Sequence, residues 1–271
     1  MKLVTHLYWG DPNEEFSFDL ARMLLDSGAD ILEIGIPYTD PVCDGEVFQR
    51  ACARAIANGI TPPKVFEGIQ KLRSEGYGHP IYLTSYFGPI FKMGVEETVK
   101  KAKEIGINGL IIPDILLEEQ EELQSTSKKY GLSIIQFATI YSDKERLKKI
   151  CYASTDVIYC IALPGVTGEQ KGDKNQLRKL MNRLIKVRSI QSKVRHSIHG
   201  RESDNKILPV PIFVGFGIQT SEDAWEIFSY GADGIIIGTA IARIYEKYIQ
   251  APQLSLSEIS AFIKDLKKSA I

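Results

Sequence analysis

Two carboxylates lie in one segment of the sequence where side chains could do acid–base chemistry. Glu33 interrupts the apolar run 31–34, and Asp44 follows in a loop rich in proline and glycine. An isolated buried charge is costly, and burial raises the pKa of a carboxyl group toward the range of a general acid or base. Two such groups in different surroundings can divide acid and base roles. The alternatives are a core Glu held by a structural partner and an Asp that only shapes a turn.

Glycines follow three successive strand-like runs near the end of the chain. They stand in the segments 165–168 (GVTG), 215–218 (GFGI) and 238–240 (GTA). Glycine lets backbone N–H groups approach a ligand closely, and a helix N-terminus adds partial positive charge, so these turns together favour a phosphate site. Simple tight turns are the alternative. The pattern predicts a phosphorylated small molecule as the ligand.

Aromatic residues stand at or near the ends of several of the same runs. They are Tyr86, Phe137, Tyr159 and Phe216. Such rings suit a flat hydrophobic part of a substrate, with carboxylates in the middle and phosphate at the far end. Core packing is the alternative for each ring, although the hydroxyl groups of Tyr86 and Tyr159 require polar partners. Asp114 adds a polar group that fits either the site or a helix cap.

Short β-branched runs alternate with amphipathic segments along the chain, which is typical of parallel strands joined by helices. Eight strands are expected at 3–9, 30–34, 81–85, 109–113, 133–137, 157–162, 212–215 and 234–237. The intervening helices are expected near 14–27, 47–58, 62–74, 95–105, 117–129, 143–152, 174–190, 221–230 and 239–249, with an extra C-terminal helix at 256–268. This α/β pattern predicts a (β/α)₈ TIM barrel, whose working groups stand at the carboxyl ends of the strands.

No composition shift or linker divides residues 1–271, so we expect a single domain. One stretch interrupts the rhythm: residues 186–206 carry six Lys or Arg against two acids. We expect this polar, basic insertion to extend the sixth crossover helix and then to form a surface excursion before the seventh strand.

Composition excludes several classes of function. The 33 basic and 34 acidic residues leave a net charge of −1, which argues against a nucleic-acid binder. No apolar run is long enough to span a membrane, and no signal-peptide pattern is present, so we expect a cytoplasmic protein. The four cysteines contain no CxxC pair, so neither a disulfide framework nor a metal site is indicated.

Motifs along nearly the whole chain resemble the tryptophan synthase alpha subunit family. The most specific is Glu33-Ile34-Gly35-Ile36-Pro37-Tyr38-Thr39-Asp40-Pro41-Val42-Cys43-Asp44-Gly45, which is similar to the family's catalytic strand and second loop. The others follow in the family's order: Gly10-Asp11-Pro12, Pro113-Asp114, Gly165-Val166-Thr167-Gly168, Gly215-Phe216-Gly217-Ile218 and Gly238-Thr239-Ala240-Ile241. The resemblance implies a carbon–carbon lyase that cleaves indole-3-glycerol phosphate into indole and glyceraldehyde 3-phosphate, without metal or organic cofactor.

The resemblance also implies roles for individual residues. Glu33 would protonate C3 of the indole ring and assist the retro-aldol cleavage, and Asp44 would accept the indole N–H. The implied substrate contacts are Tyr86, Tyr159, Thr167 and Phe216, and the implied phosphate contacts are the backbone N–H groups of Gly168, Gly217, Gly238 and Thr239.

The chain departs from the family at positions that the family uses for docking its beta subunit. Gly88 stands where the family commonly has asparagine, and Leu116 stands where it has proline. We therefore expect weak or atypical docking of a tryptophan synthase beta subunit. Two other functions remain open: another phosphosugar isomerase or synthase on the same fold, and a barrel that serves mainly as a regulatory subunit.

Overall fold

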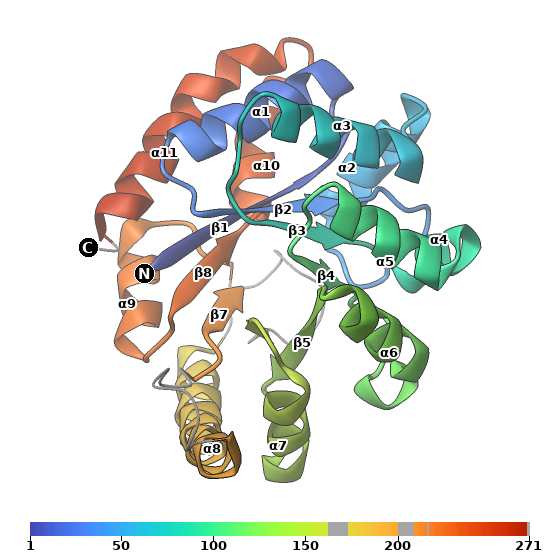
Figure 1. Cartoon of the computed structure of the whole chain (residues 1–271). Coiled ribbons are helices and arrows are strands. Elements are labelled where there is room, and N and C mark those ends of the chain that lie inside the picture. Colours follow the sequence, from blue (N-terminus) through green and yellow to red (C-terminus); the bar gives the residue numbers. More distant parts are fainter. Residues whose placement is uncertain (162–172, 200–208, 216, 270–271) are drawn as a thin grey trace.

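The computed structural model describes residues 1–161, 173–199, 209–215 and 217–269. Eight parallel strands form a closed barrel in which each strand pairs with the next and β8 pairs with β1 (Figure 1). The strands are β1 (Lys2–Tyr8), β2 (Ile31–Gly35), β3 (Ile81–Thr84), β4 (Gly109–Ile111), β5 (Ser133–Thr139), β6 (Ile158–Ile161), β7 (Ile212–Gly215) and β8 (Gly234–Ile237). The predicted (β/α)₈ barrel is confirmed.

Helices surround the barrel on its outer side (Figure 1). They are α1 (Glu14–Asp26), α2 (Glu46–Ala57), α3 (Pro62–Ser74), α4 (Phe87–Met93), α5 (Val95–Glu104), α6 (Glu121–Tyr130), α7 (Lys144–Ala153), α8 (Lys174–His199), α9 (Ser221–Ser229), α10 (Thr239–Glu246) and α11 (Leu256–Ser269), with 3₁₀ turns η1 (Leu117–Glu119) and η2 (Pro252–Ser255). Side chains of Asn13, Asp143 and Thr220 cap the starts of α1, α7 and α9, as expected for these residue types. The predicted extra C-terminal helix is present as α11. No described helix combines the length and the apolar character that crossing a membrane would require.

Helix α4 was not expected from the sequence, because Gly88 and Pro89 suggest a turn. Pro89 is the third residue of α4, where a missing N–H removes no intrahelical hydrogen bond. The start of the helix is capped from a distance: both carboxylate oxygens of Asp114 accept the N–H of Phe87, at 2.8 and 3.1 Å. The capping interpretation of Asp114 is therefore the correct one.

The strands bury two different surfaces. One set of alternating residues packs outward against the helices, and the other fills the barrel interior. The interior cluster comprises Val4, Ile31, Tyr82, Ile111, Ile135, Val157, Phe213 and Ile236, with Phe137 and Tyr159 packed against it. Because side chains alternate along a strand, residues two or four places after these face the same interior. Every second residue after a member of this interior cluster, up to the carboxyl end of its strand, is therefore expected to face the interior as well.

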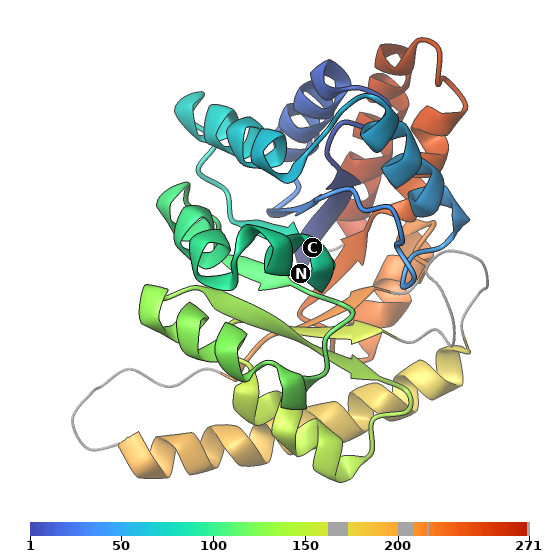
Figure 2. The ribbon, with the colours of Figure 1, turned by 90° about the vertical axis from the view of Figure 1, so that its right-hand side faces the viewer.

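Helix α8 extends beyond the neighbouring helices at its C-terminal end (Figure 2). Residues 186–199 of the basic insertion continue this helix, and residues 200–206 lie outside the described residues. The described part of the stretch is thus an extension of the crossover helix that precedes β7.

Candidate active site

A cavity of about 120 Å³ opens at the carboxyl ends of the strands. Every predicted site residue that the structure describes lines this cavity: Glu33, Asp44, Tyr86, Tyr159, Gly217, Gly238 and Thr239. Thr167, Gly168 and Phe216 lie outside the described residues. The barrel therefore brings together residues that are far apart in the sequence.

Glu33 projects from β2 into the interior and is buried. The hydroxyl of Thr84 donates to Oε1 at 2.6 Å, and Nδ1 of His6 lies 3.5 Å from the same oxygen. Oε2 has no hydrogen-bond partner among the described residues. Burial raises the pKa of Glu33 from 4.5 to about 7, against the smaller lowering effect of the Thr84 hydrogen bond. A carboxyl group with this pKa can both give and take a proton near neutral pH.

Two tyrosine hydroxyls, one at the end of β1 and one after β3, hold Asp44. Tyr8 at the end of β1 donates to Oδ2 at 2.6 Å, and Tyr86 after β3 donates to the same oxygen at 2.7 Å. The hydroxyl oxygen of Tyr86 also accepts the backbone N–H of Cys43 at 3.0 Å, which ties it to the loop that carries Asp44. Burial raises the pKa of Asp44, although the hydrogen bonds from Tyr8 and Tyr86 lower it in part. Both tyrosines are neutral hydrogen-bond donors, so neither places a positive charge beside Asp44.

Aromatic rings form one wall of the cavity. The rings of Phe137 and Tyr159, on adjacent strands β5 and β6, lie 5.2 Å apart between centroids. A Cβ on Gly215 would approach the ring of Tyr159 to 2.8 Å, so glycine at the end of β7 leaves room for this ring. Burial, followed by the nearby Glu33 and Asp44, raises the pKa of Tyr159 well above its ordinary value. Tyr159 therefore remains a phenol at any physiological pH.

Another part of the cavity lining consists of glycine turns and the start of α10. Gly217 has a φ of +56°, a conformation that L side chains rarely adopt. Thr239 is the first residue of α10, and the first N–H groups of a helix have no intrahelical acceptor, which suits them to an anion. Gly238 also has a packing role, because a Cβ there would lie 2.6 Å from the ring of Phe48. Arg243 in α10 lines the same cavity.

Sequence reasoning missed the residues that hold the two carboxylates: His6, Tyr8 and Thr84. A signal was available, since His6 and Tyr8 follow the interior residue Val4 by two and four places, and Thr84 follows Tyr82 by two. The same counting leads from Ile31 to Glu33. Extending the alternation of each strand to its carboxyl end would have found all of them.

Comparisons with known proteins agree on one family. A family model described as the tryptophan synthase alpha chain matches residues 1–271. The tryptophan synthase alpha chain of Methanocaldococcus jannaschii is 38% identical over 240 residues, which cover 89% of this chain and 78% of that one.

Solved structures show the same architecture. A structure from Aquifex aeolicus VF5 has a TM-score of 0.83 and 32% identity, covering 99% of this chain and 92% of that one. A structure of Mycobacterium tuberculosis tryptophan synthase has a TM-score of 0.82 and 26% identity, covering 99% and 91%. This chain therefore belongs to the tryptophan synthase alpha chain family.

Proposed function

We propose that this chain is a carbon–carbon lyase of tryptophan biosynthesis, which cleaves indole-3-glycerol phosphate to indole and glyceraldehyde 3-phosphate. One observation carries the proposal: Glu33 is a buried carboxyl group with a pKa of about 7 and an unpartnered Oε2, and it lines the same cavity as Asp44. A phosphate cradle alone would also suit another phosphosugar enzyme. The pair of carboxylates with different partners favours the lyase.

The two carboxylates divide the chemistry. Protonated Glu33 gives its proton to C3 of the indole ring, and the positive charge that develops on the ring nitrogen is stabilised by Asp44, which accepts the indole N–H. The carboxylate of Glu33 then takes the proton of the glycerol hydroxyl next to the ring. As that C–O becomes a carbonyl, the bond from its carbon to indole C3 breaks and the electron pair restores the aromatic ring. Glu33 ends protonated, and no cofactor is required.

The walls of the cavity fit the two ends of this substrate. The indole ring lies against the aromatic wall, with Tyr86 and Tyr159 as contacts. The phosphate lies on the backbone N–H groups of Gly217, Gly238 and Thr239. By resemblance to the family, Thr167, Gly168 and Phe216 complete the site.

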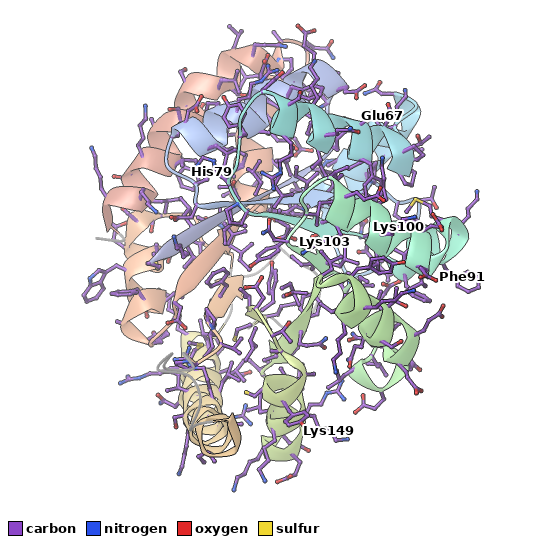
Figure 3. The ribbon with its side chains drawn as sticks, in the orientation of Figure 1. Glu67, His79, Phe91, Lys100, Lys103 and Lys149 are labelled. Carbon is purple, nitrogen blue, oxygen red and sulfur yellow. The ribbon has the colours of Figure 1, made fainter. Side chains whose placement is uncertain are left out.

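The chain docks a tryptophan synthase beta subunit at the same end of the barrel. Exposed apolar side chains occur in the segments that follow β2, β3, β4 and β5: Val42 at 58%, Phe91 at 70%, Leu116 at 61% and Tyr141 at 76% exposure. Figure 3 shows Phe91 on the outer side of α4, away from the strands. Large exposed apolar groups gathered at one end of a molecule favour a protein interface. Gly88 and Leu116 replace residues that the family uses for docking, so we expect the docking of the beta subunit to be weak or atypical.

Two further expectations belong to this proposal. The chain acts as a single barrel domain, with the basic stretch 186–206 as an insertion. It works in the cytoplasm, where the phosphorylated substrate is retained.

The test is release of indole from indole-3-glycerol phosphate by the purified chain, alone and with a beta subunit from the same organism. We expect indole formation by the parent, acceleration by the partner, and a loss of at least about a thousandfold in Glu33→Gln. Binding of indolepropanol phosphate should change little in this variant, because the amide has nearly the same shape as the carboxyl group. Turnover retained by Glu33→Gln, or no indole under any condition, contradicts the proposal.

A further inference from the structure

We propose that Thr84 is a positioning residue, which fixes Oε1 of Glu33 so that Oε2 is the oxygen that exchanges a proton with the substrate. This inference rests on the function proposed above, and it assigns different work to the two oxygens of one carboxyl group. Thr84 would act through Glu33 and need not contact the substrate itself.

The geometry around Oε1 is fixed by three neighbouring strands. Glu33 is in β2, paired on one side with β1, where it is opposite His6, and on the other side with β3, which ends at Thr84. The Thr84 hydroxyl donates to Oε1 at 2.6 Å, and only 5% of the Thr84 surface is exposed. Because both partners stand on strands of a closed barrel, neither can move without disturbing the ladder. The contact therefore holds Oε1 in place.

His6 closes the other side of Oε1 without bringing a charge. Its Nδ1 lies 3.5 Å from Oε1, and its ring packs 4.7 Å from Phe48 and 5.1 Å from Tyr8 between centroids. Burial lowers the pKa of His6 to about 4, although Asp44 raises it in part. His6 is therefore neutral in the range where Glu33 titrates. It limits the movement of the carboxyl group but does not stabilise the carboxylate by ion pairing.

Oε2 is in the opposite situation. It is buried, belongs to a side chain that lines the cavity, and has no partner among the described residues. A buried carboxylate oxygen without a hydrogen bond is costly, so this atom is best satisfied when it carries the proton or meets a donor on the substrate. The arrangement thus separates a fixed oxygen from a reactive one.

Among the residues that the structure describes, Thr84 is the one side chain that donates a hydrogen bond to Glu33. Asp44 and Tyr159 both interact electrostatically with Glu33 and bring no positive charge, and the described residues place no Lys or Arg within ion-pair distance of Glu33. A hydrogen bond to a carboxylate favours the charged form. Removing the Thr84 hydroxyl should therefore raise the pKa of Glu33 further.

The test compares Thr84→Val, which replaces the hydroxyl by a methyl group, with Thr84→Ser, which keeps the hydroxyl. The pKa of Glu33 is read in the full chain from the pH dependence of its ¹³C-labelled carboxyl resonance, assigned by its loss in Glu33→Gln. We expect Thr84→Val to raise this pKa by about one pH unit and to lower kcat for indole formation about tenfold, with KM changed less than about threefold. Thr84→Ser should restore both.

The pH profile provides a second readout. Since the reaction begins from protonated Glu33, activity falls as the pH rises through its pKa, and Thr84→Val should move this alkaline limb to higher pH. An unchanged carboxyl pKa and an unchanged kcat in Thr84→Val would overturn the role of Thr84 while leaving the lyase intact. If no variant and no parent formed indole, the proposed function itself would fail. If Thr84→Val did not fold, Thr84→Ala would replace it in the same comparison.

Discussion

Two acidic residues stand three positions apart, Asp30 just before β2 and Glu33 within it, and their surroundings shift their pKa values in opposite directions. Asp30, just before the strand, receives the ammonium groups of Lys2 and Lys267 and the backbone N–H of Leu3. Burial, the largest single effect, would raise the pKa of Asp30, but these partners together outweigh it and the pKa is lowered. Glu33, three residues further on, has only a hydroxyl donor and a neutral imidazole nearby, and its pKa is raised to about 7.

This difference separates a structural acid from a reactive one. Lys267 belongs to α11, so Asp30 joins the C-terminal helix to the amino end of the barrel and remains charged. Glu33 is kept ready to exchange a proton, and its carboxylate form destabilises the fold. Asp30 is kept charged near the amino ends of the strands, whereas the charged form of Glu33 is disfavoured nearer their carboxyl ends. This agrees with the general division in these barrels between a stabilising face and a reactive face.

The largest expected effect on stability is that of Glu33→Gln. Folding raises the pKa of Glu33 from 4.5 to about 7, so the free energy of unfolding of the parent falls as the pH rises through this interval. The full decrease is about 3 kcal/mol. The variant cannot ionise, so its free energy of unfolding relative to the parent should increase from pH 4.5 to pH 8 by up to this amount. Urea unfolding at both pH values measures it. Glu67→Gln, on the exposed surface of α3, serves as the control (Figure 3). A difference between variant and parent that does not depend on pH would contradict the burial of an ionisable Glu33.

Asp30→Asn should have the opposite sign and a smaller size. A folded-state pKa below the unfolded value contributes stability that is present at neutral pH and is lost as the pH falls through the folded pKa. We expect the variant to lose about 1 to 2 kcal/mol at pH 7 and the loss to shrink in acid. Lys2→Met, which removes the more exposed of the two cations, should cost less than about 1 kcal/mol. Equal stability of Asp30→Asn and the parent at pH 7 would mean that the ion pairs contribute nothing net.

Asp44 is intermediate between Asp30 and Glu33, because it accepts two hydrogen bonds but both donors are neutral tyrosines. Tyr8→Phe removes one of its two tyrosine donors. We expect kcat/KM for indole formation to fall about fivefold, which corresponds to about 1 kcal/mol, and the pKa of Asp44 to rise. Tyr152→Phe, at a side chain of α7 that is 78% exposed, is the matched control. A loss as large as that in Glu33→Gln would show that Tyr8 does more than position Asp44.

The fold could be predicted from the sequence because its signals are local and repeated. Each β-branched run, such as 212–215 or 234–237, became a strand at the expected place. Helix α4 escaped prediction because Gly88 and Pro89 are turn residues by type. What makes the helix possible is Asp114, a cap from a different loop, and no local pattern reveals such a partner.

The site divides in the same way. Glu33 was recognisable because a carboxylate within a buried strand is chemically unusual, and Asp44 because it is a second carboxylate in the loop that follows that strand. The partners His6, Tyr8 and Thr84 are ordinary strand residues by type, and they acquire importance only when the closed barrel sets three strands side by side. The dual role of Gly238 was likewise hidden, since the ring of Phe48 that requires it comes from α2.

The most direct test of the account is the pH dependence of kcat/KM for indole formation from indole-3-glycerol phosphate. If buried Glu33 supplies the proton to the indole ring, kcat/KM should decline above a pH of about 7, approaching a tenfold loss per pH unit, because the protonated form disappears. A profile that stays level from pH 6 to pH 9, with indole still released, would show that a different group provides the proton and would contradict the central role of Glu33.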